Sequence, residues 1–236
     1  MSTKAEKKQI KEAKQVAAKR KEKLRTLLIK LGTVIIVPTV LFVFWQGLFS
    51  GPPTLPPDVI SDADHVFGSD DAKVTITVYA DFQCPACLTE SDVIRRAWSR
   101  ISDDARLIYR HFPLDTHRFS FQAARYAEAA GKQGRFWEMH DLLFGNQVLW
   151  SSIDDATQIF DEYAQQIGLN MEQLQSDLDS ADIRGKINAD QQSGIRAGVR
   201  STPAMFINGR LAPNPQSPAR LVEMVREALD KQAGAA

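Results

Sequence analysis

The chain has 236 residues, which is enough for one domain of about 150–200 residues and an appendage. Its 29 basic and 29 acidic side chains balance, but residues 1–30 carry eleven Lys and Arg against three Glu, so the remainder has a net charge of −8. The main domain therefore has no basic excess, which argues against nucleic acid as its partner.

The first element along the chain is an apolar stretch without a charged side chain, residues 31–49, which reads LGTVIIVPTVLFVFWQGLF. With the apolar residues from Leu27 it reaches the about 20 residues that cross a bilayer as a helix. A core helix is rarely apolar on every face, and a cleaved signal peptide has a shorter apolar region before small residues. We therefore expect an uncleaved signal-anchor, a transmembrane helix over residues 27–49.

The charge around this stretch predicts its orientation. Residues 1–26 form a basic tail, and an excess of Lys and Arg before a span places that side in the cytoplasm. Residues 50–57, SGPPTLPP, contain four prolines and predict a semi-rigid extended spacer of about 3 Å per residue. We therefore expect a single-pass protein of the cell membrane, with a spacer over residues 50–64 and a folded extracytoplasmic domain over residues 65–232.

The folded domain is expected to contain alternating strands and helices, an α/β fold. The strand over residues 73–80 alternates β-branched apolar residues with Thr75, Thr77 and Tyr79. A helix over residues 85–100 and a strand over residues 105–112 follow. Helical patterns then cover residues 119–130, 136–144, 159–167, a segment opened by a capping box at Asn170 and Gln173, and residues 181–197. A strand over residues 204–208, a turn, a short strand and a final helix that starts at Ser217-Pro218 complete the chain.

Only two cysteines occur, Cys84 and Cys87, and they lie where the first strand hands over to the first helix. A disulfide-stabilised secreted scaffold has more cysteines, spread along the chain. Structural zinc takes four protein ligands, and the four histidines show no paired ligand spacing: His65, His111, His117 and His140. We therefore expect neither a metal nor a cofactor.

The position of the two cysteines favours redox chemistry. Pro85 suits the first position of a helix, so Cys84 precedes the helix and its thiolate faces unpaired backbone N–H groups and the positive end of the helix dipole. Thiols in this setting have a pKa between roughly 3.5 and 7.5 instead of about 8.5. Cys87 lies one turn later, close enough to form a disulfide with Cys84. We assign Cys84 as the attacking thiol and Cys87 as the resolving thiol; the alternative is a pair of buried, inert cysteines.

The segment Asp81-Phe82-Gln83-Cys84-Pro85-Ala86-Cys87 resembles the active-site turn of the DsbA-like family in the thioredoxin superfamily. Two further segments are similar to members of that family: His111-Phe112-Pro113-Leu114 through Phe136-Trp137-Glu138-Met139-His140, and Ser201-Thr202-Pro203-Ala204-Met205-Phe206-Ile207-Asn208-Gly209. The resemblance covers about residues 60–232. It implies a thioredoxin-like fold with a helical block inserted at about residues 116–198.

The resemblance also implies a peptide-binding wall beside the cysteines. Thr202-Pro203 is expected to be a cis peptide that faces them, which makes Pro203 a catalytic residue together with Cys84 and Cys87. Thr202, Pro203, Pro85 and Ala86 are expected to contact substrate, which binds as an extended peptide, like an added strand. The aromatic residues of the helical block are expected in its core, and His140 is expected to be structural.

Two departures from the best-known members bear on the chemistry. Those members carry Pro-His between the cysteines, whereas this chain has Ala86, so one partner of the thiolate is lost and a moderate oxidant is expected. The strand before the motif offers Val78 and Tyr79 instead of a buried acid. Asp81 is the nearest carboxylate; it either shuttles protons to Cys87 or only satisfies nearby backbone groups.

The resemblance predicts a thiol–disulfide oxidoreductase that oxidises unfolded or reduced extracytoplasmic proteins and is itself reoxidised by a membrane redox partner. One alternative is a disulfide isomerase or reductase of the same fold, kept reduced from across the membrane. Another is a non-catalytic chaperone or redox-sensing module.

Overall fold

The computed structural model describes residues 21, 23, 37–39 and 56–234. Residues 1–53 and residues 54–236 form separate units, and the fold below is that of the second. The expected basic tail, the expected anchor and the first part of the spacer lie outside the described residues, apart from the few positions named. Within the described part of the chain, no helix has the length and the apolar character needed to cross a membrane.

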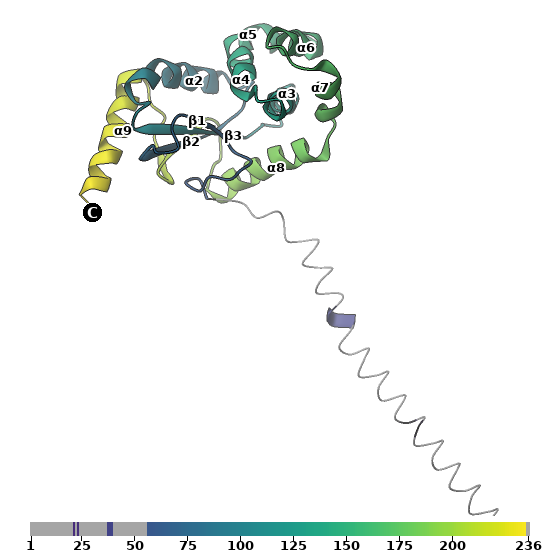
Figure 1. Ribbon diagram of the computed structural model, residues 1–236, viewed down its shortest axis with the longest axis horizontal. Coiled ribbons are helices and arrows are strands. Elements are labelled where there is room, and N and C mark those ends of the chain that lie inside the picture. The colour runs from purple at the N-terminus through teal and green to yellow at the C-terminus, as the bar shows by residue number, and fades with distance from the viewer. Residues whose placement is uncertain (1–20, 22, 24–36, 40–55, 235–236) are drawn as a thin grey trace, which may run out of the picture. The chain divides into compact units, whose positions relative to one another are not determined.

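A five-stranded sheet with the order β1-β3-β2-β4-β5 forms the centre of the domain (Figure 1). The strands are β1 His65–Phe67, β2 Val74–Ala80, β3 Ala105–His111, β4 Ala204–Ile207 and β5 Arg210–Ala212. The central pair β2 and β3 is parallel, whereas the other three pairs are antiparallel. Since β2 and β3 end in register at Ala80 and His111, the loops that follow them leave the same edge of the sheet.

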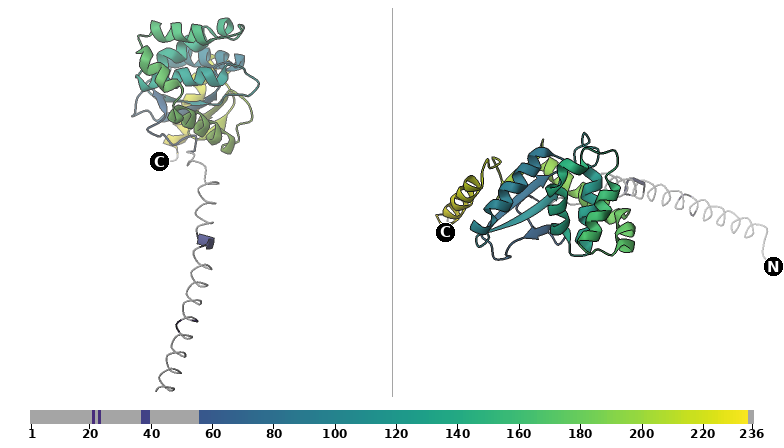
Figure 2. Two further views of the ribbon diagram at one scale, coloured as in Figure 1. Left: turned by 90° about the vertical axis from the view of Figure 1, so that its right-hand side faces the viewer. Right: turned by 90° about the horizontal axis from the view of Figure 1, so that it is seen from above.

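Helices cover both faces of this sheet. They are α2 Pro85–Ala97, the 3-10 helix η1 Trp98–Arg100, α3 Ser120–Lys132, α4 Phe136–Gly145, α5 Gln147–Trp150, α6 Thr157–Gln166, α7 Met171–Leu178, α8 Ala181–Arg196 and α9 Pro218–Ala233. Helices α2 and α9 pack against each other, and α8 packs against β2 and β3. Figures 1 and 2 show α3 to α7 gathered beside the sheet as one helical block.

The burial of β2 reflects this double coverage, because all seven of its residues are buried. Val74, Ile76 and Val78 join the main hydrophobic core, whereas Tyr79 belongs to a second cluster with Phe112 and Phe206. The hydroxyl of the buried Thr77 donates to the carbonyl of Pro57 at 2.6 Å. The strand therefore tolerates a polar residue only where a partner is supplied.

The order of elements expected from the sequence is confirmed, including the helical block between the two halves of the sheet. Two short elements were not expected: β1, which has three residues, and α5, which has four. The helix expected over residues 85–100 ends at Ala97 and continues as the 3-10 turn η1. Residues 56–59, placed in the spacer, contact the sheet, since Pro56 and Val59 accept hydrogen bonds from Arg110.

Candidate active site

The two cysteines lie at the start of α2, where β2 delivers the chain to the edge of the sheet. Cys84 is the N-cap residue, with extended backbone at φ −77° and ψ 121°, and Pro85 occupies the first turn. The carbonyl of Cys84 accepts from the N–H groups of Cys87 and Leu88 at 3.1 and 3.2 Å. Both cysteines are free thiols, with Cys84 7% and Cys87 1% exposed.

The surroundings of Cys84 favour its thiolate. The hydrogen bond with the Cys87 thiol is the largest cause of the lowered pKa of Cys84, whereas burial acts in the opposite direction and raises the pKa. The backbone N–H groups of Cys87 and Ala86 lower the pKa further, and the result is a pKa of about 5. The expectation of an activated thiol at a helix start thus agrees with the geometry, although the neighbouring thiol contributes more than the helix end does.

Cys87 has the opposite electrostatic environment. Burial raises its pKa far above the usual value, and the hydrogen bond to Cys84 raises it further. The amide of Asp81 also donates to the Cys87 sulfur at 3.5 Å. One thiol of the pair is therefore ionised at neutral pH while the other keeps its proton, which is the asymmetry that thiol–disulfide exchange requires.

The loop before β4 forms a wall beside Cys84. The Thr202-Pro203 peptide is cis, as expected, and the carbonyl oxygen of Thr202 lies 3.6 Å from the Cys84 sulfur. The Pro203 carbonyl accepts from the Asn214 amide at 2.9 Å. Pro85 and Ala86, which follow Cys84 in the chain, are exposed. Of the four residues expected to contact substrate, Thr202 lies against the attacking thiol, Pro203 follows it in the chain, and Pro85 and Ala86 follow Cys84.

The carboxylate of Asp81 is buried and has three donors. It accepts from the backbone N–H groups of Gln83 and Leu114 at 2.8 and 3.0 Å, and it contacts His117 Nδ1 at 2.7 Å. This geometry favours the interpretation that Asp81 satisfies the backbone of the active-site turn. The sequence gives no indication of the contact with His117.

Glutamine side chains tie the active-site turn to the helical block. The amide of the buried Gln147, in α5, donates to the carbonyls of Phe82 and Cys84 at 2.7 and 2.9 Å. In return, Gln83 accepts from the backbone N–H of Phe119 at 2.6 Å. The sequence gives no indication of the Gln147 contact, because α5 is too short for a recognisable periodicity.

Glu90 is a second carboxyl group near the thiols, and the sequence interpretation did not identify it. It is 4% exposed, and its Oε1 has no hydrogen-bond partner among the described residues. Burial, together with the negative charge of Cys84, raises its pKa to about 8. Its spacing from Cys87 and Ile94, three and four positions along the helix, places it on the buried face of α2. That spacing is the feature of the sequence from which the burial of Glu90 could have been predicted.

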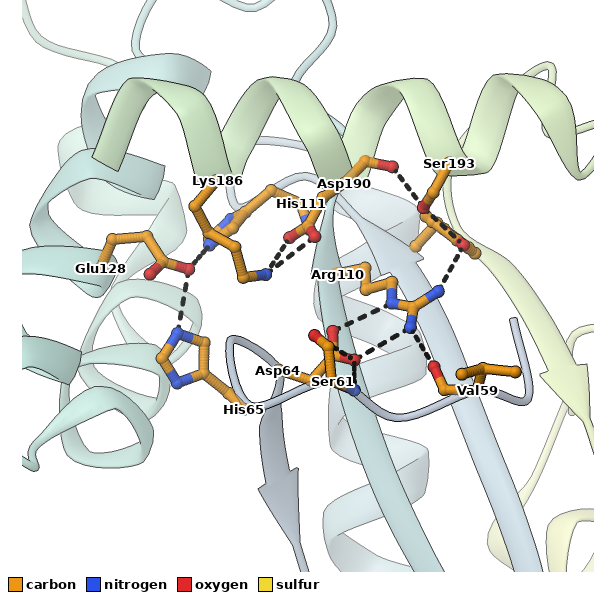
Figure 3. Close-up of polar contacts among 11 residues, drawn as sticks. Val59, Ser61, Asp64, His65, Arg110, His111, Glu128, Lys186, Asp190 and Ser193 are labelled. Atoms are coloured by element: carbon orange, nitrogen blue, oxygen red, sulfur yellow. Dashed lines mark hydrogen bonds and ion pairs between the residues drawn. The ribbon is translucent and has the colours of Figure 1, made fainter. Parts of the chain in front are cut away.

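A buried polar network connects β3, α3 and α8 to the segment before β1 (Figure 3). Within the described residues, His111, Glu128 and Asp190 have possible ligand atoms within 4.8 Å of one another. However, the Lys186 ammonium contacts both carboxylate oxygens of Asp190 at 2.8 and 2.7 Å. The lysine thus supplies the cationic partner of Asp190, so we assign the cluster a structural role.

Comparisons with known proteins identify the relatives of this chain. The chain matches the family model described as thioredoxin over residues 61–227. The Na(+)/H(+) antiporter NhaA 1 of Mycolicibacterium gilvum is 34% identical over 166 residues, 68% of this chain and 26% of the antiporter. NhaA 3 of Salinispora tropica is 36% identical over 165 residues, 70% of this chain and 24% of the antiporter. The chain thus matches only about a quarter of the length of these curated relatives.

Solved structures share the fold. A thioredoxin-like oxidoreductase from Silicibacter pomeroyi has a TM-score of 0.62 at 25% identity, over 75% of this chain and 95% of that chain. BdbD from Bacillus subtilis has a TM-score of 0.65 at 21% identity, over 76% of this chain and 100% of that chain. Alpha-DsbA1 from Wolbachia pipientis has a TM-score of 0.64 at 20% identity, over 73% of this chain and 94% of that chain. The chain therefore belongs to the DsbA-like thioredoxin family of thiol–disulfide oxidoreductases.

Proposed function

We propose that this chain oxidises protein thiols by exchanging a Cys84–Cys87 disulfide with reduced extracytoplasmic proteins. A substrate thiolate attacks the Cys84 sulfur, the Cys84–Cys87 bond breaks, and Cys87 leaves and takes up a proton. A second substrate thiolate then attacks the substrate sulfur of the mixed disulfide, so the substrate disulfide forms and Cys84 leaves as a thiolate. Two electrons pass from the substrate to the cysteine pair.

One observation carries this proposal: the pKa of Cys84 is lowered to about 5 while Cys87 retains its proton. A stabilised thiolate is a good leaving group and favours the reduced form of the pair, so the disulfide tends to take electrons from substrates. Ala86 brings no side-chain donor to the Cys84 thiolate. We therefore expect a moderate oxidant. A reduction potential of about −120 mV, the value of a strong oxidant, would contradict this expectation.

The proposed substrates are unfolded or reduced proteins that bind as extended segments. Pro85 and Ala86, next to Cys84 in the chain, are exposed, and the carbonyl oxygen of Thr202 lies 3.6 Å from the Cys84 sulfur. Backbone groups beside the thiol can pair with any extended chain and do not depend on its side chains. This arrangement suits an enzyme that acts on many sequences.

The proposed location is the outer side of the cell membrane. The apolar residues 27–49 and the basic tail before them support a signal-anchor with a cytoplasmic N-terminus. Such an anchor would hold the domain in the same plane as a membrane redox partner that reoxidises the cysteine pair after each turnover.

Refolding of a reduced client protein tests the activity. We expect the oxidised chain to introduce disulfides stoichiometrically without another oxidant, and a Cys84→Ser variant to introduce none. Thiol trapping in cells then separates the directions: a mostly oxidised pair supports an oxidase, whereas a mostly reduced pair indicates an isomerase or reductase. Client protection that persists unchanged in the Cys84→Ser variant indicates a chaperone.

A further inference from the structure

The exchange reaction needs a proton at the buried sulfur of Cys87. When the Cys84–Cys87 bond breaks, Cys87 leaves with a negative charge on a sulfur that is 1% exposed. A thiolate in such surroundings is strongly disfavoured by burial, so a nearby acid must supply a proton as the bond breaks. The reverse step, in which Cys87 attacks a mixed disulfide, needs a nearby base.

A cavity of about 180 Å³ between α2, β3 and α4 has Cys87 among its lining residues. Its walls are mainly apolar and include Ile94, Trp98 and Phe144. Two lining residues carry a buried polar atom without a hydrogen-bond partner among the described residues: Oε1 of Glu90 and the hydroxyl of Tyr109. Buried polar atoms usually have partners, so these two atoms beside a reactive sulfur require an explanation.

We infer that Glu90 is the proton-relay residue for Cys87, a role that rests on the proposed thiol–disulfide exchange. As the Cys84–Cys87 bond breaks, the Glu90 carboxylic acid gives its proton to the departing Cys87 sulfur, directly or through a water molecule in the cavity. The Glu90 carboxylate then regains a proton from solvent. In the reverse step the Glu90 carboxylate takes the proton of Cys87 while that sulfur attacks the mixed disulfide.

The other titratable groups around the cavity are less suited to this role. Burial raises the pKa of Tyr109 well above its usual value, so its hydroxyl remains protonated. Burial lowers the pKa of His140, whose Nδ1 contacts Asp141. Arg95, at the rim of the cavity, pairs with Asp92 on the same helix.

Asp81 is engaged by three donors, as described above, whereas Oε1 of Glu90 has no hydrogen-bond partner in the described part of the chain. Its pKa of about 8 lies close to neutral pH, where an acid can both give and accept a proton efficiently. The negative charge of Cys84 contributes to this pKa, so we also expect the affinity of Glu90 for a proton to rise when the cysteine pair is reduced.

The test uses Glu90→Gln, which keeps the shape of the side chain and removes the transferable proton. The matched control is Asp92→Asn, which removes a carboxylate from the same helix, where Asp92 pairs with Arg95 and Arg96 in solvent. Each variant is prepared in the full chain as the mixed disulfide of Cys84 with glutathione. Release of glutathione as Cys87 attacks Cys84 is followed against pH by acid quench and mass spectrometry.

We expect the wild-type release rate to rise through an inflection below about pH 8, because Cys84 carries no thiolate charge in the mixed disulfide. Glu90→Gln should lose the inflection and slow release about 100-fold, the lower end of the usual contribution of a general acid or base. Glu90→Asp should restore part of the inflection, and Asp92→Asn should keep the wild-type rate and profile. A wild-type rate and profile in Glu90→Gln would overturn the inference.

Alkylation of Cys84 by iodoacetamide separates this inference from the proposed function. Suppose that Cys84 of the reduced wild-type chain reacts with iodoacetamide and that the wild-type mixed disulfide releases glutathione. If Glu90→Gln then releases glutathione at the same rate as the wild type, only the role of Glu90 is wrong. If wild-type Cys84 neither reacts at neutral pH nor releases glutathione, the proposed exchange itself is wrong. A folding defect is recognised by the thermal midpoint, which we expect Glu90→Gln to keep or raise.

Discussion

The ionisation of Cys84 should depend on the neighbouring thiol, and the Cys87→Ala variant measures that dependence. The pKa of Cys84 is about 5 in the folded, reduced chain, against 9.0 for an ordinary cysteine. At pH 7 this difference stabilises the folded reduced form by about 2–3 kcal/mol, because each pKa unit corresponds to about 1.4 kcal/mol. We favour the lower end, since Cys84 follows the end of the sheet and is 7% exposed, so solvent screening weakens the effect.

The sign of this contribution follows from the direction of the shift. Because the folded pKa lies below the unfolded value, the stabilisation is fully present above about pH 9 and is lost as the pH falls through about 5. The oxidised chain has no thiol to titrate. We therefore expect the unfolding free energy of the reduced form, relative to the oxidised form, to decrease as the pH is lowered from 9 to 5.

Ultraviolet absorbance of the thiolate gives the pKa directly, and Cys84→Ser provides the blank. In Cys87→Ala the largest stabilising hydrogen bond is gone, so we expect the pKa of Cys84 to rise by at least one unit. In a Glu90→Gln background, where residue 90 takes up no proton, the potential of the cysteine pair should change by about 30 mV per pH unit between pH 5.5 and 7, since one proton accompanies two electrons. A slope of about 60 mV, or an unchanged pKa in Cys87→Ala, would refute the reasoning.

Two further predictions concern stability. Asp64→Asn should destabilise the domain by about 3–5 kcal/mol in urea unfolding. Asp64 and Arg110 form an ion pair with side chains only 2% exposed, so the variant leaves the charge of Arg110 buried without its carboxylate. A loss of stability as small as that of Asp92→Asn would contradict this prediction. Gly194→Ala should cost about 1–3 kcal/mol, because its Cβ would lie 2.8 Å from Phe112 and 2.9 Å from Tyr79. Gly185→Ala, in open space on the same helix, should instead stabilise by roughly 0.5–1 kcal/mol, and equal effects of the two substitutions would refute the packing argument.

The parts of the fold that could be predicted are those with a strong local signal. The β-branched alternation before Cys84 predicts β2, and Pro85 predicts the start of α2. Asn170 and Ser217 were expected as caps, and their side chains accept from the N–H groups of Gln173 and Arg220. The cis peptide at Thr202-Pro203 was expected only through the resemblance to the DsbA-like family, because X–Pro bonds are usually trans.

The parts that could not be predicted depend on contacts between distant segments. Strand β1 has three residues and no periodicity of its own; it is held by pairing with β3 and by His65, which stacks on Phe136 with ring centroids 3.5 Å apart. Asp64 and Arg110 lie 46 positions apart, and the His111 amide donates to Asp190 across 79 positions. From the sequence such charged residues are assigned to the surface, where charged side chains usually lie.

Two buried glutamates show why the location of a charge alone does not give its chemistry. Burial would raise the pKa of Glu128, but hydrogen bonds from His111 and His65, at 2.8 and 2.9 Å, hold it well below its usual range. Glu90 is also buried, but its Oε1 has no hydrogen-bond partner within residues 56–234 or at the other described positions, so burial and the charge of Cys84 raise its pKa to about 8. Glu128 therefore remains charged and fixed in a structural network, whereas Glu90 can exchange a proton near neutral pH. The difference comes from the tertiary partners, and it leaves one acid beside Cys87 free to take part in the exchange reaction.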